Sequence, residues 1–308
     1  MTDDCYPTRV DGACQILPRE DPVVHGNEDG PLTPAQVAEF EKHGFLFFDS
    51  FLGRDEVAAL KNETEELRVS EAVRQSEVAV NEPTTGDTRS IFAVESVSDM
   101  IRDLVSDQRL LGMVRQLLGG DVYPNQTRLN FKPRFRGKEF YWHSDFETWH
   151  AEDGMPRMRA VSCSIALSDN FAYNGPLMLV PGSHKHYCQC QGWTPDAHYQ
   201  QSISKQDLGV PSDEQLEWLT NAGGIAAPTG NAGSIVLYDC NTMHGSNGNI
   251  TPYPRINLFV AYNSVANALV EPYAADEPRP WYYGNREPEP LNPVDFPATL
   301  GQLRAKTA

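Results

Sequence analysis

The sequence contains no long apolar run and comparatively few basic residues. No stretch approaches the roughly 18 consecutive apolar residues of a membrane span, and no apolar segment of the signal-peptide kind follows the acidic start. The 42 Asp and Glu residues outnumber the 25 Lys and Arg residues, so the net charge is −17. This charge opposes binding to nucleic acids and anionic membranes. We therefore expect a cytoplasmic protein with no nucleic-acid and no membrane partner.

A paired cysteine framework is also missing. Cys188 and Cys190 are the only close pair, and the second pair that a four-cysteine zinc site requires is absent. We therefore expect free thiols in a reducing compartment. The six cysteines are Cys5, Cys14, Cys163, Cys188, Cys190 and Cys240.

Low-complexity tracts are absent, and 40% of the residues are hydrophobic, which is enough for a packed core. In the first 120 residues, apolar residues recur at helical spacing. Thr33 and Pro34 mark the start of the first helix, and Gly44 marks its end. We expect helices over 34–43, 55–67 and 98–118, and a short strand over 45–48.

After Val122 the pattern changes to short β-rich runs separated by Gly, Pro and Asn. Strands are expected over 126–131, 139–145, 160–167, 177–180, 233–239 and 255–263. One helix interrupts them near 212–222, where Ser212 and Gln215 form a capping box. The predicted fold class is mainly β with flanking helices, around a double-stranded β-helix of the jelly-roll or cupin-like kind.

We interpret residues 1–308 as one domain, because single all-β domains of 200 to 250 residues are common. Its expected parts are an extended N-terminal arm over 1–31, a helical flank over 33–118, the jelly-roll core over 121–265 and a C-terminal tail over 266–308. The arm is rich in Pro, Gly and Asp, so we expect it to lie extended over the surface. The tail after Pro288 is Pro-rich and then polar.

The segment from Phe140 to His150 places metal-binding side chains among aromatic residues. If 139–145 is a strand, its period of two turns His143 and Asp145 to the same face. A second histidine would complete the 2-His-1-carboxylate triad that holds Fe(II) and leaves three coordination positions open. His244 is the candidate. Because a His beside an Asp is more often a hydrogen-bonded pair than a ligand set, the triad needs support from its surroundings.

Arg255 supplies that support. It follows His244 by eleven positions and starts an apolar run that we expect to be the next strand. A guanidinium group there can reach back into the pocket and bind a carboxylate through two hydrogen bonds, and Ser246 offers a hydroxyl group to the same carboxylate. If Arg255 does not bind it, Lys132 and Arg134 are the next cations to consider.

Four segments carry a closer likeness to a known family. The longest runs without interruption from Trp142 to Pro156, and the others cover 126–133, 175–184 and 239–249. They resemble the signature segments of the ectoine hydroxylases, which are Fe(II)- and 2-oxoglutarate-dependent dioxygenases of the phytanoyl-CoA hydroxylase type. The resemblance extends from about Tyr6 to Pro290.

The resemblance implies a cofactor set and a reaction. Fe(II) would be held by His143, Asp145 and His244, with 2-oxoglutarate and O2 as co-substrates. The family also implies that 2-oxoglutarate contacts Phe140 and Asn130, besides its distal carboxylate on Arg255. The implied reaction is hydroxylation of ectoine to 5-hydroxyectoine, with release of succinate and CO2.

Ectoine is a small cyclic amidine with a carboxylate, so its pocket should offer a cation and an aromatic face. Arg128 and Trp149 suit these tasks, and Gln126 and Thr148 add neutral hydrogen-bonding groups. The resemblance also implies that the pocket wall includes Phe259 and Tyr238.

Three rival functions stay open. A hydroxylase of another small cyclic amino or imino acid would keep the iron and Arg255 but change the substrate pocket. Tyr238 bears on this alternative, because most relatives are expected to have Phe there and a hydroxyl group alters the pocket. A hydrolytic or isomerising zinc or manganese enzyme would have no need for Arg255. A non-catalytic ectoine-binding protein is disfavoured, because all three metal ligands are present. A homodimer and a monomer are both compatible with the sequence.

The remaining six histidines are not expected to bind metal. His184 and His186 follow a turn and have no carboxylate partner in the sequence nearby. His150 either lines the rim of the pocket or caps a loop. The histidines expected at the surface are His25, His43 and His198.

Overall fold

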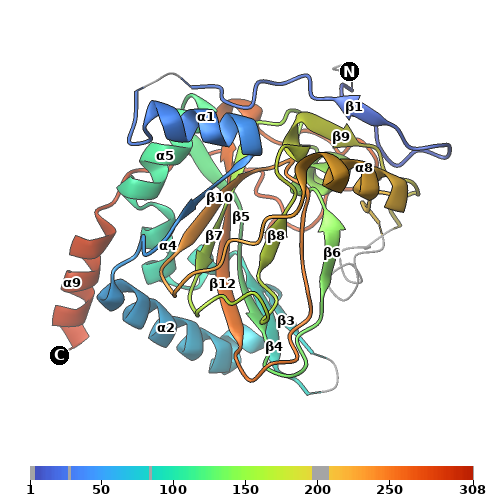
Figure 1. Cartoon of the computed structure of the whole chain (residues 1–308). Coiled ribbons are helices and arrows are strands. Elements are labelled where there is room, and N and C mark those ends of the chain that lie inside the picture. Colours follow the sequence, from blue (N-terminus) through green and yellow to red (C-terminus); the bar gives the residue numbers. More distant parts are fainter. Residues whose placement is uncertain (1–3, 27–28, 83–84, 196–207, 308) are drawn as a thin grey trace.

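The computed structural model describes residues 4–26, 29–82, 85–195 and 208–307, and two antiparallel sheets form its centre (Figure 1). The larger sheet has the strand order β2-β10-β7-β12-β5-β4-β3, and the smaller sheet has the order β6-β11-β8. The larger sheet contains β2 (Phe45–Phe48), β3 (Ala79–Asn81), β4 (Thr88–Phe92), β5 (Val122–Lys132), β7 (Ala160–Ala166), β10 (Ile235–Asp239) and β12 (Arg255–Ser264). The smaller sheet contains β6 (Phe140–His143), β8 (Leu177–Leu179) and β11 (His244–Ser246). This is the predicted jelly-roll core.

Strand β12 organises the larger sheet, because it pairs with β5 on one side and with β7 on the other. Phe259 lies opposite Arg128 of β5 and Ser164 of β7. Since side chains alternate along a strand, Arg128 and Phe259 share one face, while Leu129 and Leu258 lie buried on the opposite face. One side of the sheet therefore carries polar residues such as Arg128, and the other side is apolar.

Helices cover the apolar side of the larger sheet, where α2, α4 and α5 lie in Figure 1. The helices before the core are α1 (Pro34–His43), α2 (Arg54–Val69), α3 (Glu71–Arg74), α4 (Asp99–Val105) and α5 (Gln108–Leu118). The predicted start and end of α1 are confirmed, because Thr33 caps it and Gly44 has a left-handed backbone with φ 81°. A Cβ at Gly44 would lie 2.4 Å from Nδ1 of His184, so the position also requires a glycine for space.

The predicted single helix over 98–118 is wrong, because it is two helices. The first ends at Val105 with Ser106 as its C-cap. The carboxylate of Asp107 caps the second by accepting a hydrogen bond from the backbone N–H of Arg109. Short polar side chains compete with the helical backbone for hydrogen bonds in this way. Ser106 and Asp107 therefore interrupt the helix, although the helical spacing of apolar residues continues past them.

The insert and the chain ends add further elements. Helix α8 (Asp213–Gly223) begins at the predicted capping box of Ser212 and Gln215. In the arm, β1 (Ile16–Pro18) pairs with β9 (His186–Cys188). The tail ends in α9 (Phe296–Thr307), which the sequence interpretation missed. Its start could have been recognised, since Asp295 accepts from the N–H of Ala298 beside Pro297. The single-turn helices are η1 (Val94–Ser96), η3 (Ser183–Lys185) and η4 (Val265–Asn267).

The composition of the arm suggested a layer over the surface. The structure shows that the arm also contributes to the core. Tyr6 is fully buried, and its ring centre lies 5.2 Å from those of Phe146 and Tyr187.

Cys14 and Cys190 remain unbridged, as predicted, and so do Cys163, Cys188 and Cys240. Among the described residues, no helix is both long and apolar enough to cross a membrane.

Candidate active site

A cavity lies between the two sheets, and both contribute to its wall. The lining residues are Gln126, Arg128, Asn130, Phe140, His143, Asp145, Trp149, Ser162, Leu177, Tyr238, His244, Gly245, Ser246, Arg255, Phe259 and Ala261. Of the site residues predicted from the sequence, only Thr148 is absent from this wall. Its hydroxyl group instead lies near Gly209, where a Cβ would be 3.2 Å from it.

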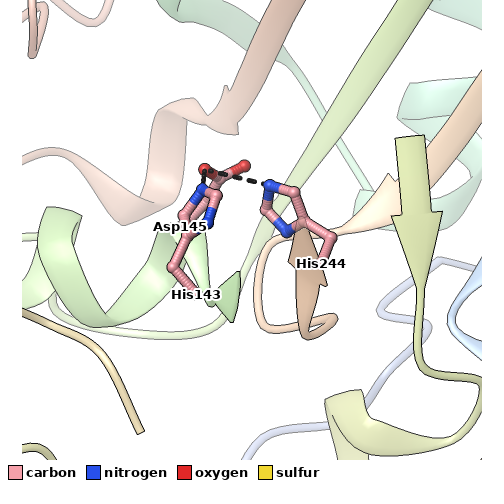
Figure 2. Close-up of side chains that lie close together, drawn as sticks. All are labelled: His143, Asp145 and His244. Atoms are coloured by element: carbon pink, nitrogen blue, oxygen red, sulfur yellow. Dashed lines mark ion pairs between the residues drawn. The ribbon is translucent and has the colours of Figure 1, made fainter. Parts of the chain in front are cut away.

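His143, Asp145 and His244 direct their polar atoms toward one another (Figure 2). Oδ1 of Asp145 lies 3.7 Å from Nε2 of His143 and 3.7 Å from Nε2 of His244. Strand β11 pairs with β6, so that the two histidines face each other across the smaller sheet. Over the described ranges, no other cluster of His, Cys, Asp and Glu side chains is close enough to hold a metal ion.

Backbone carbonyl groups fix the tautomer of both histidines. Nδ1 of His143 lies 2.8 Å from the carbonyl oxygen of Tyr141, and Nδ1 of His244 lies 2.9 Å from that of Thr242. Because a carbonyl oxygen only accepts, each Nδ1 must carry the hydrogen when these bonds form. Each Nε2 is then left with a lone pair directed toward Asp145, which is how protein ligands are oriented at metal centres.

The ionisation of the triad also suits a metal. Burial opposes the charge of Asp145, but attraction to His244 and His143 outweighs it and lowers the pKa of Asp145 to about 2. Burial, together with the neighbouring His143, lowers the pKa of His244 to about 4. At neutral pH the site therefore offers an anionic carboxylate and a neutral imidazole, the forms that bind metal ions.

The spacing of the three ligand atoms fits one ion. Atoms about 2.1 Å from an ion and at right to tetrahedral angles lie roughly 3.0 to 3.5 Å apart, so the 3.7 Å spacing requires only a small adjustment. Ser162, which the sequence interpretation missed, donates a hydrogen bond of 3.0 Å to Oδ2 of Asp145. This contact leaves Oδ1 facing the two histidines.

The prediction that 139–145 is one strand is wrong at its end. Strand β6 ends at His143, and Asp145 begins helix α6 (Asp145–Thr148), which continues as the π-helix η2 (Trp149–Asp153). Ser144 stands at the N-cap position with an extended backbone. The pair Ser144 and Glu147 has the spacing of a capping box, a helix-start signal that the aromatic run before it obscured. The two ligands still converge, although one comes from a helix.

Arg255 supplies positive charge to the wall of the cavity. Nη1 of Arg255 donates to the carbonyl oxygen of Gly175, and this is its only side-chain hydrogen bond within the described residues. Burial, together with repulsion from Arg128, lowers the pKa of Arg255 to about 10, so the side chain stays charged at neutral pH. Its other donors are available to an anionic ligand.

Of the two alternative cations, only Lys132 lies close to this position. Its Nζ is 2.8 Å from Oγ of Ser246 and also donates to the carbonyl oxygen of Asn247. Burial and the neighbouring Arg255 lower the pKa of Lys132 to about 7. Arg134 is exposed, with its guanidinium group 6.0 Å from the ring of Phe135, and it does not line the cavity.

Arg128 is a half-buried cation framed by aromatic rings. Its guanidinium carbon lies 5.3 Å from the ring centre of Phe259 and 5.7 Å from those of Phe92 and Phe140. Burial lowers its pKa, although nearby Asp145 favours the charged form, and its Nε has no hydrogen-bond partner. A buried donor without a partner is costly, so a carboxylate ligand here would satisfy an unmet requirement.

The remaining predicted residues take several places around the cavity. Trp149, at the start of η2, is buried in the wall. Gln126 donates to the carbonyl oxygen of Tyr283 over 2.7 Å. The ring centre of Tyr238 lies 5.0 Å from that of His244. Burial raises the pKa of Tyr238 well above its usual value, so its hydroxyl group stays protonated.

The other histidines lie outside the cavity. His150 is buried, with Nδ1 2.8 Å from the carbonyl oxygen of Met155, so it caps a loop and does not line the pocket rim. His184 is buried with Nε2 3.1 Å from the carbonyl oxygen of Glu41. The prediction that His25 and His43 lie at the surface is only partly met, since both are half-buried. His198 falls outside the described residues.

Comparison with known proteins agrees with this fold. The family model of the phytanoyl-CoA dioxygenases matches residues 40–257. The chain therefore belongs to the phytanoyl-CoA dioxygenase family. Within that family it groups with the ectoine dioxygenases. It is 50% identical over 293 residues to the ectoine dioxygenase of Halomonas elongata, across 94% of this chain and 88% of that protein.

Solved structures give the same grouping. A crystal structure of EctD from Sphingopyxis alaskensis with bound Fe superimposes with a TM-score of 0.85 at 44% identity. A second crystal structure, of EctD from the same organism with 2-oxoglutarate and 5-hydroxyectoine, superimposes with a TM-score of 0.86 at 45% identity. Each match covers 94% of this chain and 98% of the solved chain.

Proposed function

We propose that this protein is an Fe(II)- and 2-oxoglutarate-dependent dioxygenase that hydroxylates ectoine to 5-hydroxyectoine, with succinate and CO2 as co-products. One observation carries the proposal: a three-ligand metal cluster shares its cavity with two arginines, the buried Arg255 and the half-buried Arg128. Within the described residues, neither Arg128 nor Arg255 has a carboxylate in hydrogen-bonding contact. The reaction requires two organic ligands, and each of them carries a carboxylate that needs a cation.

The residues divide the work as follows. His143, Asp145 and His244 would hold the metal. Bound iron and 2-oxoglutarate together supply the oxidising power that places an oxygen atom from O2 on a substrate carbon. Arg255 would bind the distal carboxylate of 2-oxoglutarate, with Ser246 donating a further hydrogen bond.

The walls around these ligands would complete the co-substrate site. Phe140 and Asn130 line the cavity beside Arg255 and Ser246, where they would flank 2-oxoglutarate. Phe140 also packs on the metal side, with its ring centre 4.8 Å from that of His143. Such an apolar wall keeps bulk water away from the reacting centre.

Ectoine would lie across the substrate half of the cavity. Its carboxylate would pair with Arg128, and its delocalised cation would lie on the ring of Trp149. Phe259 and Tyr238 would form the wall, and Gln126 would offer a neutral hydrogen-bonding group. Positioning between two fixed groups decides which carbon reacts. Thr148 would act only indirectly, because its side chain does not line the cavity.

A turnover assay tests the proposal. Protein loaded anaerobically with Fe(II) is mixed with 2-oxoglutarate and O2, and succinate and hydroxyectoine are quantified with and without ectoine. We expect equimolar products only when ectoine is present. Proline and other small cyclic amino acids serve as competitors, because the hydroxyl group of Tyr238 could favour one of them. Faster hydroxylation of a competitor would reject ectoine as the substrate while retaining the iron chemistry.

We further propose that residues 1–308 act as one domain and that the enzyme works in the cytoplasm. Unbridged cysteines such as Cys163 and Cys240 support a reducing compartment. A homodimer stays a prediction that sedimentation of the purified protein would test.

A further inference from the structure

Outside the cavity, buried acidic side chains of α6 and η2 form a cluster with two arginines. Its carboxylates belong to Glu147 of α6, the helix that begins at Asp145, and to Glu152 and Asp153 of η2. Its cations come from the two ends of the chain, Arg9 from the arm and Arg279 from the tail. None of these five side chains lines the cavity, so the proposed reaction does not by itself explain them.

Arg9 makes the most extensive of these contacts. Its Nε lies 2.8 Å from Oε1 of Glu147, and its Nη2 lies 3.1 Å from Oε2 of Glu147 and 3.1 Å from Oε1 of Glu152. Thr8 adds a hydrogen bond of 2.8 Å to Glu147. The side chains of Arg9 and Glu147 are each 1% exposed. This is a bidentate ion pair removed from water, the geometry in which an arginine fixes a carboxylate most firmly.

Glu152 joins the two ends of the chain. Its Oε1 faces Arg9, and its Oε2 lies 3.7 Å from Nε of Arg279. Burial raises the pKa of Glu152 despite the attraction of Arg279 and Arg9. Loss of either arginine would therefore leave a carboxylate that is poorly tolerated in its present position.

Two backbone features indicate that this region needs such anchoring. Arg9 has a left-handed backbone with φ 56°, an unfavourable conformation for a residue with a side chain, which its surroundings must hold. Helix η2 is a π-helix, a rare form that occurs mostly as single turns and frequently at functional sites. Trp149 is its first residue, between Glu147 and Glu152 in sequence.

We propose that Arg9 is a positioning residue for the substrate, because it holds Glu147 and Glu152 and thereby fixes the turn that presents Trp149 to the cavity. This inference rests on the proposed function, in which Trp149 binds ectoine. The N-terminal arm thus helps to form the substrate half of the site without touching the substrate. The co-substrate half, with Arg255 and Ser246, lies on strands of the two sheets, whereas within the described residues the side chain of Arg9 makes its hydrogen bonds to Glu147 and Glu152.

The test compares Arg9→Met with Arg19→Met. Both remove an arginine of the arm with a buried ion pair, since Nη1 of Arg19 lies 2.8 Å from Oδ1 of Asp239. We expect Arg9→Met to raise the KM for ectoine at least about tenfold and to leave the KM for 2-oxoglutarate within about twofold. Arg9→Lys keeps the charge and should recover part of the loss. Arg19→Met should change the two KM values by similar factors. An equal rise of both KM values in Arg9→Met would overturn the proposal.

Hydrogen exchange gives a readout that does not require the substrate. Amides of residues 145–155 should exchange faster in Arg9→Met than in wild type, and should stay unchanged in Arg19→Met. Unchanged exchange in Arg9→Met would contradict the positioning role. If wild-type protein fails to bind ectoine while the exchange result holds, the proposed substrate is wrong and the anchoring of this turn by Arg9 stands.

Discussion

The larger and smaller sheets contribute different chemistry to the cavity. The smaller sheet brings His143 and His244 together on short strands, and backbone carbonyl groups orient both imidazoles. The larger sheet contributes the half-buried Arg128 and the buried Arg255 from long strands. In the proposed site, the two histidine ligands therefore come from the smaller sheet and the two carboxylate-binding arginines from the larger sheet. Substitutions on the two sheets should separate iron binding from the binding of organic ligands.

The largest effect is expected at the metal ligands. His143→Ala, Asp145→Ala and His244→Ala should each remove iron and activity and leave the fold intact, because packing already closes the jelly roll. Asp145→Glu should also fail, since one added methylene moves the oxygen beyond the narrow range of metal-ligand distances. Metal analysis and circular dichroism provide the measurement. A variant that keeps both iron and normal turnover would show that its residue is not a ligand.

On the larger sheet, Arg255→Ala should raise the KM for 2-oxoglutarate strongly and leave iron binding nearly unchanged. The expected loss is about 2 to 5 kcal/mol, because a charge-assisted contact in a buried site is removed. Iron content is measured on the same samples. If the KM stays at its wild-type value, the distal carboxylate belongs to another cation, of which Lys132 is the nearest candidate.

A smaller effect is expected for Trp149→Ala. Loss of the aromatic face should weaken ectoine binding by roughly 1 to 2 kcal/mol, while iron and 2-oxoglutarate binding survive. Calorimetric titration with ectoine under anaerobic conditions measures the change. Equal weakening of 2-oxoglutarate binding would indicate a general disturbance of the cavity and not a lost substrate contact.

The smallest effect concerns pH. Burial and Arg255 lower the pKa of Lys132 to about 7, well below its ordinary value of 10.5, so the folded side chain loses its proton as the pH rises through 7. Between pH 7 and 10.5, Lys132 is protonated in the unfolded chain and largely deprotonated in the folded protein. Across this range, the contribution of Lys132 therefore makes the folded protein more stable as the pH rises. A bound anion favours the charged form, so the KM for 2-oxoglutarate should rise modestly above pH 7. Lys132→Met should flatten this dependence, and an unchanged profile in that variant would exclude Lys132 as its origin.

Much of the cavity wall follows from local sequence patterns. Alternation along a strand is enough to place Arg128 and Asn130 on one face of β5, and the spacing of His143 and Asp145 survives even though a helix starts between them. The contacts between distant parts of the chain that support the site cannot be predicted from local sequence patterns. Arg9 and Glu147 are 138 positions apart, and nothing local in either segment indicates that they meet. Ser162 was missed for a related reason. It is a small residue in an apolar strand, and nothing in that strand indicates its hydrogen bond to Asp145.

The assignment of one carboxylate to each arginine is the central claim, and one crossed measurement tests it. The KM values for 2-oxoglutarate and for ectoine are determined for Arg255→Ala and Arg128→Ala, with iron content as the control. We predict that Arg255→Ala raises the KM for 2-oxoglutarate with little change for ectoine, whereas Arg128→Ala abolishes ectoine-dependent turnover and still binds 2-oxoglutarate. If both variants lose the same ligand, the two arginines form a single anion site and the account is contradicted.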